Sequence, residues 1–140
     1  YRVLLQTPAI PTKGIGPSSP PMGAFIILRD MAGNLTGEAF VLEYRRSIGI
    51  WDQFGTDIQA YNGGLGIRKT RLDLSDPSNG PTIQDATPGT PCCKDAALKP
   101  TSWTGATWVS NLYGVTITAY PSGQAGMWVA ITLGNNYPTG

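Results

Sequence analysis

Hydrophobic and polar positions alternate along much of the chain, and this alternation predicts short β-strands rather than helices. In residues 40–45 the apolar side chains of Phe40, Leu42 and Tyr44 alternate with a mixed set, so one strand face is apolar. The same period of two returns in residues 115–120, where every second side chain is apolar. The pattern therefore indicates an all-β chain with little helix.

Turn signals separate the predicted strands. The strands are expected over residues 2–5, 24–28, 38–46, 65–74, 109–120 and 127–133. A Gly-Asn pair at 33–34 is a hairpin signal, so the second and third of these runs are expected to pair antiparallel, and Gly63-Gly64 allows a tight turn before the fourth. The last run is rich in large apolar residues and is expected to be central. The predicted core contains Phe25, Ile27, Phe40, Leu42, Tyr44, Val115, Ile117, Val129 and Ile131.

The predicted fold is an antiparallel β-sandwich or small barrel of about seven short strands. Residues 1–22 are expected to form a Pro-rich N-terminal strand and arm, residues 23–134 the β-sandwich domain, and residues 135–140 a C-terminal tail. Proline blocks ladder hydrogen bonds, so the arm is either a surface connection or an extended segment that lies across a neighbouring subunit.

Composition supports one domain with few helices. The 140 residues include 18 Gly and 12 Pro, which break helices, while 41% of the residues are hydrophobic and can form a core. The net charge of +1 provides no electrostatic footprint for nucleic acid or an anionic membrane. No apolar run approaches the ~20 residues of a membrane span. Neither nucleic acid nor a membrane span is therefore expected.

The predicted location is extracellular. The chain starts at Tyr1 without an initiator methionine or a signal peptide, as a processed secreted product would. The triplet Asn34-Leu35-Thr36 is a glycosylation sequon that fits this compartment, and it makes Asn34 a candidate glycosylation site.

The chain contains no histidine, and this limits its chemistry. Ser/His/Asp triads, Cys/His dyads and histidine-based zinc sites are excluded within these residues. Nine acidic residues leave paired carboxylates, but none lies in a catalytic motif, so no enzymatic activity is expected. Asp73, Asp76 and Asn79 are candidate calcium ligands, because calcium takes several oxygen ligands from a flexible loop. The alternative is that these three residues only make Asx turns, and no other cofactor is expected.

Cys92 and Cys93 are adjacent, and their chemistry remains open between three alternatives. A disulfide between neighbours forms a strained ring, but it would stiffen the turn at residues 88–91. The second alternative is pairing with cysteines outside this chain, and the third is a pair of buried, reduced thiols. None of the three makes a redox enzyme, because the C-x-x-C spacing is absent.

Trp51, Trp103 and Trp108 lie in stretches that resemble loops, where aromatic faces can stack on sugar rings. These three residues are therefore candidate contacts for a glycan or another partner. The competing interpretation is that they fill the core, because aromatic side chains dominate core burial.

Blocks in several parts of the chain resemble one known family. The blocks are FVLEYRRSIGIWD at 40–52, GLGIRKTRLD at 64–73, DATPGT at 85–90, DAALKPTSWTG at 95–105 and YGVTITAY at 113–120. In this order they resemble the region downstream of the zinc-binding helix in secreted metallopeptidases of the gametolysin and immune-inhibitor type. The resemblance covers most of the chain, about residues 24–133.

The resemblance implies a β-rich accessory region and not an active peptidase. The family signature is His-Glu-x-x-His with a further zinc ligand, and none of these residues can be carried over to a chain without histidine. In the family segment that corresponds to residues 66–73, a histidine often precedes the aspartate, whereas this chain has Arg68 to Arg71 before Asp73. For the matched residues Glu43, Arg45 and Asp52, the expected role is a structural ion pair or a loop cap.

The expected function is that of a non-catalytic extracellular module used for structural packing or for contact with a matrix or partner. Its partners would be the parent catalytic domain, a matrix component or glycan, or other copies of the chain. Two alternatives stay open: a glycan-binding module, and a self-assembling extracellular subunit that uses the Pro-rich arm and the cysteine pair as contacts.

Overall fold

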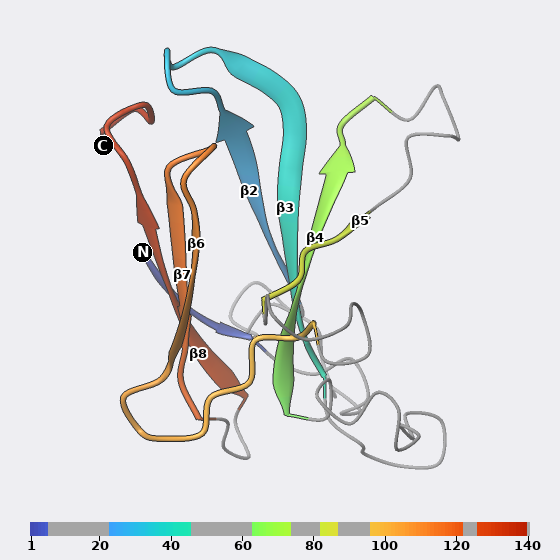
Figure 1. The fold of residues 1–140 in the computed structure, drawn as a ribbon, viewed down its shortest axis with the longest axis vertical. Helices are drawn as coiled ribbons and strands as arrows, with labels where there is room; N and C mark the ends of the chain where they lie inside the picture. The colour runs from blue at the N-terminus through green and yellow to red at the C-terminus, as the bar shows by residue number, and fades with distance from the viewer. Residues whose placement is uncertain (6–22, 46–62, 74–81, 87–95, 122–125, 140) are drawn as a thin grey trace, which may run out of the picture.

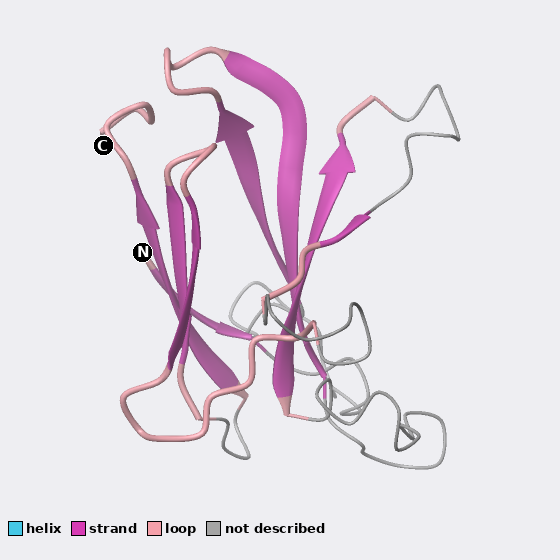
Figure 2. Ribbon diagram, in the orientation of Figure 1, coloured by secondary structure: helices cyan, strands magenta, loops and turns pink. Residues whose placement is uncertain are grey.

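The computed structural model describes residues 1–5, 23–45, 63–73, 82–86, 96–121 and 126–139, and these form two four-stranded antiparallel sheets (Figure 1). The first sheet has the order β1 (Arg2–Leu5), β8 (Met127–Leu133), β7 (Val115–Ala119) and β6 (Ala106–Ser110). The second sheet has the order β2 (Gly23–Arg29), β3 (Leu35–Arg45), β4 (Gly64–Arg71) and β5 (Thr82–Ile83). Figure 2 shows strands joined by loops and no helix in this part of the chain. The all-β sandwich prediction is confirmed, and the sheets do not close into a barrel.

The core lies between the two sheets, where alternate side chains of each strand meet. Its largest fully buried members are Tyr44, Phe40, Leu5, Leu28, Leu42, Leu65, Ile67, Ile117, Met127, Val115 and Val129. Phe40 lies edge-on to two rings of the opposite sheet, with centroid distances of 5.3 Å to Trp108 and 5.6 Å to Tyr113. Each fully buried aliphatic or aromatic side chain contributes about 1.5–3 kcal/mol of transfer free energy, so this layer stabilises both sheets together.

The predicted core is wrong at two positions on β2. Phe25 and Ile27 are 67% and 45% exposed, whereas Ile26 and Leu28 are buried. In this strand both sets of alternating positions are apolar, so the pattern cannot say which set faces inward. Pairing with β3 decides, because it places Ile26 opposite Phe40 on the core side.

The predicted run over residues 109–120 is a hairpin and not one strand. β6 ends at Ser110, β7 begins at Val115, and residues 111–114 turn between them. Gly114 has a φ of +65°, a conformation that favours glycine. The other apolar runs lie in strands, and β8 is central in its sheet as expected, because it pairs with β1 and β7.

Asn136 joins the upper ends of the two sheets, near the C-terminus labelled in Figure 1. Its Nδ2 donates to the backbone oxygens of Asp30 at 2.9 Å, Tyr113 at 3.1 Å and Arg29 at 3.2 Å. The neighbouring Tyr137 is buried, and its hydroxyl accepts a hydrogen bond from the Arg29 amide. Residues assigned to the C-terminal tail thus tie the β2–β3 turn to the β6–β7 turn.

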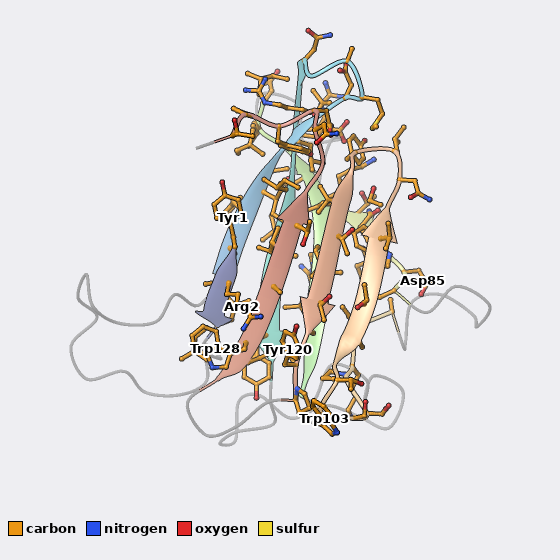
Figure 3. All side chains as sticks on the ribbon, turned by 90° about the vertical axis from the view of Figure 1, so that its left-hand side faces the viewer. Tyr1, Arg2, Asp85, Trp103, Tyr120 and Trp128 are labelled. Atoms are coloured by element: carbon orange, nitrogen blue, oxygen red, sulfur yellow. The ribbon has the colours of Figure 1, made fainter. Side chains whose placement is uncertain are left out.

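The edges of the sheets differ in how they are covered. The outer edge of β4 is covered by β5 and by residues 96–98, because Leu65 and Leu98 exchange backbone hydrogen bonds of 2.9 and 2.8 Å. Among the described strands, β1 pairs only with β8 and β2 only with β3. These two edges lie on the same side of the sandwich, as Figure 3 shows, and no described strand pairs with either of them.

Candidate functional site

The outer face of the first sheet is rich in hydroxyl groups. It carries the side chains that alternate with the core residues, namely Arg2, Leu4, Thr107, Val109, Thr116, Thr118, Tyr120, Trp128, Ala130 and Thr132. The hydroxyl oxygens of Thr107 and Thr118 lie 3.0 Å apart across neighbouring strands. This surface can therefore offer several donors and acceptors at fixed positions.

A hollow of about 310 Å³ lies at one end of this face, and its described lining residues are Arg2, Tyr120, Trp128 and Val129. We call it the aromatic hollow, and Figure 3 shows three of its lining residues, Arg2, Tyr120 and Trp128, near one end of the sheet. Trp128 is 53% exposed although it lies on a central strand. The Tyr120 amide donates to the Trp128 backbone oxygen at 3.0 Å, and Arg2 pairs with Ala130, two residues along β8. Regular sheet pairing therefore brings Arg2, from the start of the chain, next to Tyr120 and Trp128 near its end.

Gly105 makes room for the Tyr120 ring. A β-carbon at residue 105 would lie 2.7 Å from the Ala119 backbone oxygen and 3.2 Å from a ring carbon of Tyr120. Gly105 also has a φ of +86°, which other residues adopt at a cost. The sequence around this glycine thus permits the position of the ring in the hollow.

The first sheet carries very little charge. Arg2 is the one charged residue in its four strands, and residues 96–140 contain no Asp or Glu. Arg2 is the charged member of the described residues that line the hollow, and no carboxylate in the strands of its own sheet offsets the guanidinium.

A second concave surface lies between the edges of β1 and β2. This edge groove has a volume of about 440 Å³ and is apolar over most of its lining, with Arg29 as the charged member. Its described lining residues are Tyr1, Val3, Ala24, Phe25, Ile26, Ile27, Arg29, Leu35, Ile131, Leu133, Tyr137 and Pro138. The groove exposes the margin of the hydrophobic core to solvent.

The outer face of the second sheet continues this apolar surface. Strand register places Phe25, Val41, Arg68 and Ile83 in one row across β2, β3, β4 and β5. Phe25 is 67% exposed and Ile83 40% exposed. The row mixes apolar contact area with one cation, as surfaces that bind proteins commonly do.

Two charged side chains away from both concavities have shifted pKa values. The pKa of Asp30 is lowered, chiefly because its carboxylate accepts a hydrogen bond from the Asn34 amide at 2.9 Å. Burial opposes the charge on Lys69, but the Glu38 carboxylate at 3.5 Å and the Tyr113 side chain raise its pKa overall. Both groups are explained by local structure and indicate no reactive site.

The tryptophans predicted as contacts have different environments. Trp103 is 84% exposed in a turn, whereas Trp108 is partly buried and packs against Phe40. Trp51 lies outside the described residues. Trp128 and Tyr120 were not predicted, although alternation in residues 127–133 already places Trp128 opposite the apolar Met127 and Val129.

The other predicted site residues are only partly covered. Glu43 and Arg45 share one face of β3, and Asn34 is exposed in the turn before that strand. Asp73 is also exposed. The following positions lie outside the described residues: the side chain of Arg45, Asp52, Asp76, Asn79, Cys92 and Cys93.

Within the described ranges, no three His, Cys, Asp or Glu side chains are grouped so that they could hold a metal ion. None of the described segments forms a helix long and apolar enough to cross a membrane. Comparison of the chain with protein-family profiles, with curated proteins and with solved structures finds no match.

Proposed function

We propose that this chain is a non-catalytic extracellular module that packs against a protein partner through the edge groove and the adjoining face of the second sheet. The partner we infer is the catalytic domain of a metallopeptidase of the gametolysin and immune-inhibitor type. The observation that carries the proposal is the apolar edge groove, bordered by the exposed side chains of Phe25 and Ile27.

An apolar strand at the edge of a sheet is a liability unless another surface covers it. Natural edge strands are protected by charges, by proline or by short length. β2 has seven residues, and its first six, GAFIIL, contain neither a charge nor a proline. The strand therefore has the composition of a covered surface, and a partner on β2 would remove Phe25 and Ile27 from water.

The shape of the groove favours a protein segment as its occupant. It lies between two strand edges, each of which has backbone donors and acceptors that no described strand pairs. An extended chain with apolar side chains at alternate positions satisfies both the backbone groups and the groove. A compact polar ligand would leave the exposed apolar side chains in water.

The family of the partner rests on the resemblance described above. Two of its blocks, at residues 40–52 and 64–73, include the second half of β3 and all of β4, the central strands of the sheet that borders the groove. The chain has no histidine, so the zinc-binding residues of such a peptidase would belong to the partner. Packing against that domain would then be the role of this module.

The first test is the coding sequence that precedes Tyr1, in which we expect a zinc-binding His-Glu-x-x-His helix. The second is to produce that catalytic segment and this chain as separate polypeptides and to measure their binding. Phe25→Lys should weaken binding by about tenfold or more, because it places a charge in a desolvated contact. Val109→Lys on the outer face of the first sheet is the matched control and should have no effect. Absence of the helix would refute the proposal that the parent protein is a metallopeptidase. Equal binding by both variants would refute the proposal that the edge groove is the binding surface.

A further inference from the structure

We propose that the aromatic hollow binds an acidic oligosaccharide, that is, a sugar chain that carries carboxylate or sulfate groups. This site does not depend on the docking surface proposed above, because the hollow lies on the outer face of the opposite sheet. Three properties of the described residues support it: the exposed Trp128 ring beside Tyr120, an adjacent row of hydroxyl groups, and a cation whose own sheet has no carboxylate in its strands.

The rings are held in place before any ligand arrives. Trp128 lies within β8, which is paired on both sides, and the Tyr120 backbone is bonded to that of Trp128. Aromatic faces bind the apolar C–H faces of sugar rings, and rings on a paired strand lose little freedom on binding. Trp128 keeps 53% of its surface exposed although it lies on a central strand, which leaves part of the ring available for a ligand.

The row beside the hollow can hold the next part of a sugar chain. Strand register places Arg2, Ala130, Thr118 and Thr107 side by side across the sheet. Ala130 has a small side chain between the larger Arg2 and Thr118, so a ligand can approach the sheet more closely there. A ligand that stacks on Trp128 can extend over Ala130 and reach the hydroxyls of Thr118 and Thr107, which lie 3.0 Å apart.

Arg2 determines the chemical class of the ligand. A guanidinium binds carboxylate and sulfate groups through paired N–H donors, and a neutral sugar would not use it in this way. The strands of the first sheet contain no carboxylate that could neutralise Arg2. The combination of rings, hydroxyls and one cation therefore matches a sugar chain with anionic groups better than a neutral one.

The test is a titration of the full chain by calorimetry and tryptophan fluorescence with four probes. The probes are a short oligogalacturonate, a sulfated dextran oligosaccharide, a neutral malto-oligosaccharide and polyglutamate. We expect at least one of the two acidic sugars to bind about tenfold more tightly than the neutral sugar, with an affinity that falls as salt is added. Polyglutamate carries carboxylate groups but no sugar rings that could stack on Trp128, and we expect it to bind far more weakly than the acidic sugars.

Two substitutions separate the rings from the charge. Trp128→Ala should weaken binding of every sugar by about tenfold, whereas Arg2→Gln should weaken only the acidic sugars, by about threefold or more. Arg2→Lys should retain part of the preference for acidic sugars. Trp103→Ala is the matched control, because this exposed ring lies outside the residues that line the hollow, and it should change binding by less than about twofold.

Each other outcome would overturn the proposal. Binding of none of the sugars would refute a carbohydrate site. Equal affinity for neutral and acidic sugars, or no effect of Arg2→Gln, would refute the acidic class while the stacking site remained. Equal binding of polyglutamate would reduce the hollow to a general anion contact. Arg2 and Trp128 are exposed, so we expect both variants to fold. Circular dichroism of each variant tests this and excludes unfolding as the cause of weaker binding.

Discussion

The two sheets share one core but present different outer faces. The first sheet has a single charged residue in its strands, a set of threonines and the aromatic hollow. The second has charged residues of both signs together with exposed apolar side chains and the edge groove. Small side chains and hydroxyls suit a ligand that needs specific hydrogen bonds, whereas a broad apolar surface suits a protein.

This difference shows that a small sandwich can carry two kinds of surface without a second domain. Alternation along a strand assigns every second residue to the core and leaves the others free to vary. The core requires apolar residues from both sheets, so the inward-facing residues of the two sheets are similar in kind. Only the outward positions do, and they are the positions on which the two proposals depend.

The largest expected effect comes from removing a core side chain on which both faces depend. Ile117→Ala should lower the free energy of unfolding by ~2–5 kcal/mol, through lost burial and the cavity left behind. Chemical denaturation measures the change, and Ile83→Ala is the matched control because Ile83 is 40% exposed. A loss of the same size in the control would mean that burial between the sheets is not what stabilises the fold.

The next largest effect is expected from removing the hydrogen bonds that join the two sheets at their upper end. Asn136→Asp replaces a donor to three backbone oxygens by a carboxylate that repels them, and we expect a loss of about 3 kcal/mol. Asn135→Asp, at an exposed neighbour, should change stability by less than about 0.5 kcal/mol. Similar thermal midpoints for the two variants would show that Asn136 does not join the sheets.

A smaller effect distinguishes the two outer faces directly. Phe25→Lys should leave stability nearly unchanged, because the ring is 67% exposed, but it should reduce self-association and dye binding at the edge groove. Val109→Lys on the other face removes a 51% exposed side chain and should change neither property. Light scattering and a hydrophobic dye measure the difference. Equal light scattering and equal dye binding by the two variants would show that the two faces do not differ in their tendency to associate.

The smallest effect concerns the turn before β3. The Asn34 amide lowers the pKa of Asp30, so the charged carboxylate stabilises this turn above the pKa that Asp30 has in the unfolded chain. That contribution is lost as the pH falls through the lowered pKa of the folded state. An NMR titration should give a pKa for Asp30 below that of an ordinary aspartate, and a higher value would contradict the hydrogen bonds seen in the turn.

The sequence determined the fold class because period-two alternation and turn residues are local signals. Phe40, Leu42, Ile117 and Val129 are buried as the alternation predicts. The same signal could not orient β2, because both faces of its strand are apolar, and pairing with β3 decided that Ile26 and not Phe25 faces the core.

Only the tertiary structure decided where the candidate sites lie. Arg2, Tyr120 and Trp128 are brought together by pairing between β1 and β8 and between β7 and β8, and no local pattern specifies such pairs. The edge groove likewise exists because strand order places β1 and β2 at edges on the same side of the sandwich. The alternation within a strand depends on its own residues, whereas strand order depends on how the described strands of both sheets pair and pack around one core.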